Sequence, residues 1–423
     1  MATVSYRPEW LNSGRLKRVL DKINDGTSVN LDGAIQFIDW DFQQYFDLLS
    51  DAFRFPESLT GEEFRALAYR GCLDLRKEGV VTKGKLLEIV NKKASDALAV
   101  PVTRFSMWTN LRLRRMVSVP GFRVSYGDVN IRGVARLPEK YVLDDYFISG
   151  VGDIRPNAVR DSGYVILQCK SRSEEDAAKK MFNSLDTFYA ITNLFWRSVS
   201  MWTDRHIQAN VWMGPYQFFW KGRQFLGKDK IWYSPNFDKE EWRRFPKDAG
   251  ELLKRLPQIR HGLRKLETHP LRPILSAAAK LVHEGMASPD LSYRLLRYWS
   301  ALETLYSEGG NKNVPYERLI RRATFAEKDR ELAIMKLEHL ARLRNIYVHS
   351  GDTEREKSEL TQYLREVLAH QILYLIRFAD DLQDHNELLE MVDLPSDLEL
   401  LERRRRAIKR RENIIRHGRH LDQ

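Results

Sequence analysis

The stretch Arg344-Asn345-Ile346-Tyr347-Val348-His349-Ser350-Gly351 closes a segment whose apolar residues recur at helical spacing. Leu337, Ala341 and Val348 fall on one stripe of the predicted helix, and Arg344 falls on the same stripe. A guanidinium keeps its charge, so an arginine among apolar neighbours needs an acceptor. Glycine can adopt the left-handed conformation that ends a helix. The pattern therefore predicts a helix from about Glu331 that ends at Gly351, with His349 in its last turn.

Asn345 and His349 are i, i+4 neighbours, so their side chains share a face of this helix. The helix end would then gather a guanidinium, a carboxamide and an imidazole. The same separation of arginine and histidine occurs at two other places, Arg264 with His269 and Arg365 with His370. What distinguishes the motif is its setting, namely an apolar-striped helix, an asparagine directly after the arginine and a helix stop after the histidine.

An upstream segment, Tyr298-Trp299-Ser300-Ala301-Leu302-Glu303-Thr304-Leu305, also has helical spacing. Together with Arg-Asn-x-x-x-His at a helix end, it resembles the HEPN superfamily, and more narrowly its Apea-like branch. The resemblance covers roughly the C-terminal third of the chain. It implies a short helical bundle, a metal-independent ribonuclease that needs no cofactor, and an active site formed across a two-fold homodimer. It also implies antiviral (anti-phage) defence, in which a phage-derived trigger unleashes RNA cleavage and growth stops.

Glu303 stands four residues after Trp299 and three before Tyr306, inside the apolar stripe of the upstream helix. A buried carboxylate needs a partner, and Arg344 is the natural one because a bidentate pair would fix its guanidinium. The alternative is a buried ion pair that only orders the bundle. Even in that case, the pattern predicts that Glu303 and Arg344 meet.

Transesterification of RNA uses the 2′-hydroxyl as an internal nucleophile and needs a base and an acid rather than a metal. His349 suits both proton transfers near neutral pH, and Arg344 would stabilise the charge that develops on the phosphate. Asn345 would orient His349 or donate to a phosphate oxygen. Tyr347 and Ser350 are candidate substrate contacts, with packing and helix capping as the alternatives. One chain offers one motif histidine, so a homodimer would supply the pair.

The chain has 423 residues, 43% of them hydrophobic, which favours two or three globular domains over one. Its two cysteines, Cys72 and Cys169, exclude a disulfide framework and a cysteine zinc cluster, and favour a reducing cytoplasm. No apolar run is long enough to cross a membrane, and the N-terminus lacks the apolar core of a signal peptide. No His-x-x-x-His pair or carboxylate cluster indicates a metal site.

The pattern along the chain predicts a multidomain α+β protein. Residues 1–100 have helical spacing, with a capping box at Thr60 and Glu63 and a break at Gly84. Residues 101–255 have strand and hairpin patterning, and we expect an α+β domain with a possible sensor role. Residues 256–390 indicate the helical bundle, and residues 391–423 form a basic tail.

Basic residues are concentrated at the C-terminus. Residues 401–423 hold nine Lys or Arg against three Asp or Glu, which is +6 of the net +11. Arg403, Arg404, Arg405 and Arg406 are the candidate contacts to RNA phosphates, and a solvated helix or a disordered run is the alternative. Residues 195–245 are rich in aromatic and basic residues, a composition that suits either base stacking or core packing.

Three functions remain open at this stage. The first is a metal-independent endoribonuclease. The second is a HEPN-like dimer that binds RNA or a nucleotide without cutting it. The third is a DNA-binding regulator that uses the N-terminal helices and the basic tail.

Overall fold

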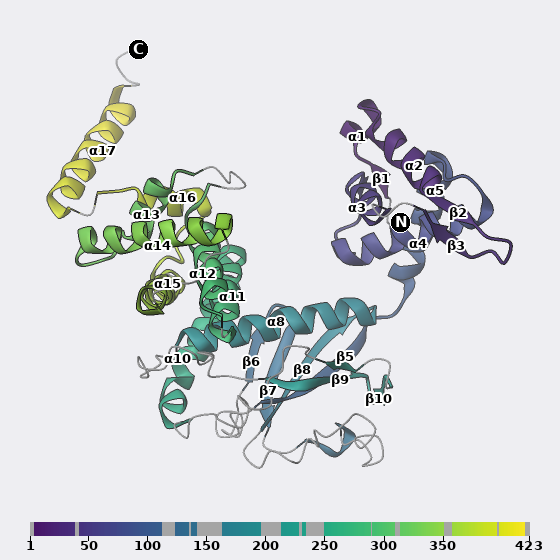
Figure 1. The fold of residues 1–423 in the computed structure, drawn as a ribbon, viewed down its shortest axis with the longest axis horizontal. Helices are drawn as coiled ribbons and strands as arrows, with labels where there is room; N and C mark the ends of the chain where they lie inside the picture. Colours follow the sequence, from purple (N-terminus) through teal and green to yellow (C-terminus); the bar gives the residue numbers. More distant parts are fainter. Residues whose placement is uncertain are drawn as a thin grey trace. The chain divides into compact units, whose positions relative to one another are not determined.

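The computed structural model describes residues 4–38, 42–111, 123–134, 137–141, 163–195, 213–227, 231–233, 249–288, 290–308, 314–350, 358–395 and 397–418. The chain is a mixed α+β protein, as its sequence predicts (Figure 1). It divides into two compact units, each made of several segments. The first comprises Met1–Met107, Leu167–Phe182 and Phe218–Ile231, and the second comprises Trp108–Ile166, Asn183–Gln217 and Trp232–Gln423.

The N-terminal part of the first unit is helical, with short strand pairs between the helices. Its helices are α1 (Pro8–Asn12), α2 (Arg15–Asp25), α3 (Phe42–Asp51), α4 (Gly61–Glu78) and α5 (Lys83–Ala99). Strand β1 (Ser5–Tyr6) pairs with β4 (Phe53–Arg54), and β2 (Thr27–Val29) pairs with β3 (Ile35–Phe37). The helical expectation for residues 1–100 therefore missed these strands, which are too short to show a two-residue period.

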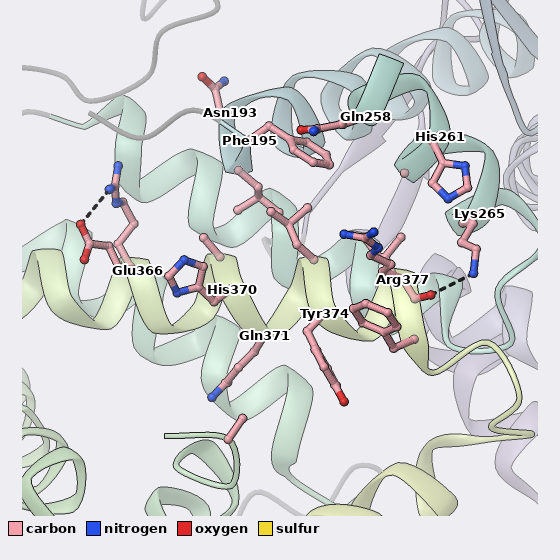
Figure 2. Close-up of a pocket in the computed structure, with 18 of the residues that line it drawn as sticks. Asn193, Phe195, Gln258, His261, Lys265, Glu366, His370, Gln371, Tyr374 and Arg377 are labelled. Carbon is pink, nitrogen blue, oxygen red and sulfur yellow. Dashed lines mark hydrogen bonds and ion pairs between the residues drawn. The ribbon is translucent and has the colours of Figure 1, made fainter. Parts of the chain in front are cut away.

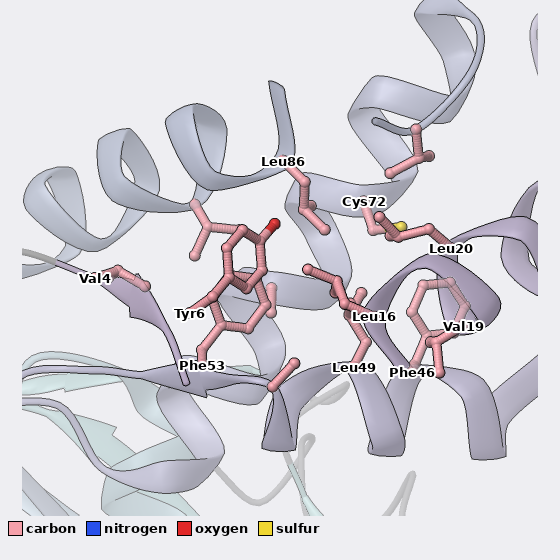
Figure 3. Close-up of a cluster of buried hydrophobic side chains, with 14 of the residues drawn as sticks. Val4, Tyr6, Leu16, Val19, Leu20, Phe46, Leu49, Phe53, Cys72 and Leu86 are labelled. Carbon is pink, nitrogen blue, oxygen red and sulfur yellow. The ribbon is translucent and has the colours of Figure 1, made fainter. Parts of the chain in front are cut away.

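One hydrophobic core holds these helices together (Figure 3). Tyr6 stacks on Phe53 with ring centroids 4.6 Å apart, and Phe53 meets Phe64 edge-on at 5.4 Å. The predicted capping box is confirmed, because Thr60 Oγ1 accepts from Glu63 N and Glu63 Oε2 accepts from Thr60 N. The predicted break at Gly84 is wrong, since Gly84 lies in the first turn of α5, where a glycine is tolerated.

A seven-stranded sheet has the order β10-β9-β5-β8-β7-β6, with β11 also paired to β9. Its strands are β5 (Thr103–Leu111), β6 (Arg123–Tyr126), β7 (Val129–Val134), β8 (Gly163–Ser171), β9 (Met213–Lys221), β10 (Gln224–Phe225) and β11 (Trp232–Tyr233). The hairpin predicted at Gly127-Asp128 is confirmed, because β6 and β7 pair antiparallel and Gly127 has φ 57°.

Helix α8 (Glu174–Leu194) follows β8, as the sequence predicts, and lies along the sheet (Figure 1). Ser184 Oγ donates to the Tyr126 carbonyl at 3.2 Å, which ties the helix to β6. The short 3-10 helix η1 (Glu139–Tyr141) follows β7.

The C-terminal helices of the second unit are α10 (Ala249–Thr268), α11 (Arg272–Ala287), α12 (Leu291–Tyr306), α13 (Tyr316–Ala323), α14 (Arg330–Ser350), α15 (Ser358–Phe378), α16 (His385–Val392) and α17 (Leu398–Gly418). Helices α11, α12 and α15 pack on one another, and α14 contacts α12, α13 and α15. The boundary expected at 255/256 falls inside α10, whose internal Pro257 does not end the helix. Within the described residues, no helix is both long and apolar enough to cross a membrane.

Helices α11 and α12 approach so closely at Gly285 that only a glycine fits. A Cβ at this position would overlap the ring of Tyr298 on α12. Trp299, the next residue, is also buried. This close contact fixes the α12 segment that carries Glu303, and so it positions one wall of the candidate site.

Candidate functional site

Helix α14 carries the motif, as predicted. It spans Arg330–Ser350 and places His349 in its last turn. Leu337 and Ala341 are buried, whereas Val348, expected on the same apolar stripe, is 49% exposed. The stripe therefore faces the bundle at the middle of α14 and leaves it toward the helix end. The predicted stop at Gly351 lies outside the described residues.

Arg344 extends from α14 toward α12 and α13. Its Nη1 donates to Tyr316 Oη at 2.9 Å and to Asn345 Oδ1 at 3.2 Å. Its Nη2 lies 4.0 Å from Glu303 Oε1, an ion pair rather than a hydrogen bond. The guanidinium is therefore held by three side chains, two of which the sequence had singled out.

Glu303 differs from its sequence-based expectation in two respects. Its side chain is 39% exposed rather than buried, and its contact with Arg344 is a single long one rather than bidentate. Trp299 Nε1 donates to Glu303 Oε1 at 3.0 Å and so fixes the carboxylate. The side chain starts within the apolar stripe of α12 but is long enough to turn its charge toward water, which avoids the cost of burial.

Tyr316 completes the cluster, and the sequence reasoning missed it. Its hydroxyl accepts from Arg344 and donates to Asn345 Oδ1 at 3.2 Å, and its ring meets Trp299 edge-on at 5.7 Å. It is the first residue of α13, directly after Pro315. A proline followed by a helix start marks where this tyrosine stands along the chain, but not the side to which its hydroxyl turns.

His349 is exposed at the end of α14. It follows Arg344 by five residues, which on a helix of 3.6 residues per turn is about 140° around the axis and about 7.5 Å along it. The imidazole and the guanidinium therefore leave α14 in different directions. Asn345, four residues before His349, shares its face. Because Asn345 Oδ1 already accepts two hydrogen bonds, its Nδ2 is the group left to act as a donor.

The other predicted substrate contacts lie outside this cluster. Tyr347 is half-buried on α14, and the side chain of Ser350 is outside the described residues. Arg403, Arg404, Arg405 and Arg406 are exposed on α17, and no described contact joins them to Arg344. Arg404 lines a separate cavity of about 540 Å³ together with other arginines, namely Arg318, Arg321 and Arg330.

The aromatic region 195–245 is described only in part. Phe218, Phe219 and Trp220 are buried in β9, so for these three residues core packing is the correct interpretation. Trp196, Trp202, Trp212 and Trp242 lie outside the described residues. In the part of the chain that the structure describes, no three His, Cys, Asp or Glu side chains are grouped as metal ligands.

The comparisons with known proteins add no assignment to this geometry. No family model, no curated protein and no solved structure matches the chain.

Proposed function

We propose that the chain is a metal-independent endoribonuclease that cleaves RNA through attack of the 2′-hydroxyl on the adjacent phosphate. The observation that carries this proposal is the Arg344 cluster. Tyr316, Asn345 and Glu303 hold a guanidinium at the surface of α14, and an exposed imidazole stands at the end of the same helix. A fixed cation can stabilise a phosphorane, and an accessible imidazole can move protons near neutral pH.

In this mechanism His349 takes the proton of the 2′-hydroxyl, or gives one to the leaving 5′-oxygen. The two tasks belong to two imidazoles, because one cannot be protonated and neutral in the same step. Arg344 stabilises the additional negative charge on the phosphate, and Asn345 Nδ2 donates to a phosphate oxygen or to His349. Glu303 and Tyr316 orient the guanidinium and do not touch the substrate.

The second imidazole would come from a homodimer that apposes two copies of α14. Two observations support this arrangement. His349 and Val348 are exposed at the helix end, and α14 also exposes Leu332 and Met335, the latter to 64%. A two-fold contact would cover these apolar side chains and bring one protomer's His349 toward its partner's Arg344. Native mass measurement should detect a dimer, and full activity of a monomer at high dilution would contradict this part of the proposal.

The basic helix α17 would hold RNA by its phosphates. Arg403, Arg405 and Arg406 are exposed, and Arg405 has one ion pair, at 3.5 Å to Glu402. Deleting residues 401–423 should weaken RNA binding and flatten its dependence on salt, because each lost phosphate contact releases fewer counterions. The setting that we propose is the cytoplasm, where both cysteines are free and buried thiols. The biological role would be anti-phage defence by growth arrest, under restraint by the remainder of the chain.

The test is incubation with total RNA in EDTA. The wild-type chain is compared with His349→Ala and Arg344→Ala, and Arg342→Ala, an exposed arginine on the same helix, serves as the control. Cleavage that survives EDTA and the control substitution but is lost in both motif variants supports the proposal. Cleavage that persists in His349→Ala would contradict it.

One observation favours the second candidate, a dimer that binds RNA or a nucleotide without cutting it. Arg344 Nη1 already donates to two groups of its own chain, and Nη2 faces Glu303. A guanidinium so engaged can order the bundle without any substrate. Binding of RNA without cleavage in the same assay would select this candidate.

A further inference from the structure

A cavity of about 1080 Å³ lies within the second unit, away from the Arg344 cluster in sequence (Figure 2). Its walls come from α10, α15 and the end of α8. One side of α15 presents residues at i, i+4, i+8 and i+11, which are Glu366, His370, Tyr374 and Arg377. Two residues of α10, His261 and Lys265, are also i, i+4 neighbours and stand across from them (Figure 2). The volume is near the upper end for small-ligand sites.

Aromatic rings form a ladder along one wall. The ring centroids of Phe325 and Tyr374 are 6.4 Å apart, and those of Tyr374 and Phe378 are 5.1 Å apart. Tyr374 is 46% exposed and Phe378 is 57% exposed. Large aromatic side chains are seldom left open to water without a function, because each could bury a large apolar area. Successive open rings are suited to receiving planar groups.

Cations accompany the ladder. The Arg377 guanidinium lies 5.0 Å from the Phe378 ring centroid, and among the described residues it has no carboxylate partner. Lys265 Nζ donates to the Arg377 carbonyl and to Asp380 Oδ2, each at 2.9 Å, which ties α10 to the end of α15. The aromatic wall therefore has a free guanidinium at its edge.

A buried arginine adds positive charge to the same wall. Arg365 is 3% exposed, and its Nε and Nη1 have no hydrogen-bond partner among the described residues. Its one ion pair is with Glu366 at 3.5 Å, a carboxylate whose side chain is 50% exposed. A buried guanidinium with so little compensation raises the potential of the cavity and favours an anionic ligand.

We propose that this cavity binds the nucleotide units of single-stranded RNA, with bases on the ring ladder of Tyr374 and Phe378 and a phosphate on Arg377. Every base has a flat face that stacks on an aromatic ring, and each phosphate needs a cation, so the two wall chemistries match the two halves of a nucleotide. A purely apolar ligand would leave Arg377 and Arg365 uncompensated. The proposal deepens the proposed function, on which the choice of RNA rests. The same chemistry would also hold a free nucleotide.

The test is a binding measurement on the full chain carrying His349→Ala, in EDTA, so that cleavage does not interfere. The probe is a fluorescent oligoadenylate of about 12 nucleotides, within the usual span of single-strand sites. Unlabelled AMP competes in a second arm. Tyr374→Ala should weaken RNA binding roughly 5- to 100-fold through lost stacking and leave the salt dependence unchanged. Tyr374→Phe should stay within about 2-fold of the parent, since its ring still stacks.

Arg377→Gln should weaken binding and lower the salt slope by about 1, as expected for one lost phosphate contact. Arg264→Gln is the matched control, because this arginine is exposed on α10 but does not line the cavity. Competition by AMP would assign the cavity to single nucleotides as well as RNA, and its absence would assign it to the strand.

Affinities of Tyr374→Ala and Arg377→Gln that equal that of Arg264→Gln would overturn the proposal, as would a parent chain that binds neither probe. Binding that depends on Tyr374 in a chain that never cleaves RNA would instead contradict the ribonuclease function alone.

Discussion

Trp299 and Glu303 stand one turn apart on α12, and the indole Nε1 donates to the carboxylate Oε1 at 3.0 Å. The tryptophan is buried, so it gives the partly exposed carboxylate a fixed anchor. The same oxygen faces Arg344 at 4.0 Å. One buried indole thereby orients an ion pair at the surface of the bundle, and the guanidinium inherits that order.

Glu303→Gln separates the charge of this residue from its hydrogen bond. Glutamine keeps an oxygen for Trp299 but removes the negative charge opposite Arg344. Because the ion pair is long and partly exposed, unfolding should become easier by less than about 1 kcal/mol. Cleavage should fall more, roughly 10-fold, because the guanidinium loses its orienting charge. Denaturant unfolding and RNA cleavage measure the two effects, and unchanged cleavage would argue against an orienting role for Glu303.

Tyr316→Phe removes one hydroxyl and leaves the ring against Trp299. Arg344 Nη1 would lose an acceptor at 2.9 Å, and Asn345 Oδ1 would lose a donor at 3.2 Å. We expect cleavage to fall roughly 5- to 20-fold, with a stability loss of about 1 kcal/mol. A double-mutant cycle with Asn345→Ala should show coupling, since both side chains hold one guanidinium. Strictly additive effects would mean that the two residues act separately.

Much of the helical architecture could be predicted because its signals are local. The acidic first turn and apolar spacing of α8, and the capping box of α4, depend on residues within a few positions of each other. The strands β2 and β3 were missed because three residues cannot display an alternation. Gly84 was taken for a break because a glycine at a helix start and one at a helix end look alike in sequence.

The candidate site could be predicted only in part, for a different reason. Arg344, Asn345 and Glu303 came from helical spacing, which tells which residues share a stripe. Spacing does not tell where a stripe leaves the core, so the exposure of Glu303 and Val348 was not foreseen. Tyr316 belongs to another helix, and its meeting with Arg344 depends on how α13 packs on α14. The cavity between α10 and α15 depends on tertiary packing in the same way.

Gly285→Ala should destabilise the bundle by about 1–3 kcal/mol, because the new methyl group would overlap the Tyr298 ring in a packed interface. Gly84→Ala is the matched control. It lies in α5 with nothing within 4 Å of an added Cβ, so it should be neutral or stabilise by about 0.5 kcal/mol. Thermal and denaturant unfolding of both variants measure the difference. Equal behaviour of the two would mean that α11 and α12 are not in close contact.

The folded chain should lose stability as the solution is acidified below about pH 6.5. Burial lowers the pKa of His283 from its usual 6.5 to about 4, and Asn193 Nδ2 lies 3.1 Å from its Nδ1. The unfolded chain therefore binds this proton first, and between pH 6.5 and 4 the folded state loses up to about 3 kcal/mol. His283→Gln keeps an acceptor for Asn193 and cannot titrate, so its melting temperature should vary less over this range. An unaltered pH profile would exclude His283 as the cause.

The chemistry of the cleaved ends tests the central claim most directly. An RNA oligonucleotide is incubated with the wild-type chain in EDTA, and the products are identified by mass. Attack by the 2′-hydroxyl predicts a 2′,3′-cyclic phosphate on one fragment and a 5′-hydroxyl on the other, with no cleavage where the 2′-hydroxyl is replaced by hydrogen and none by His349→Ala. Fragments with a 5′-phosphate, or cleavage at the 2′-deoxy position, would contradict the mechanism.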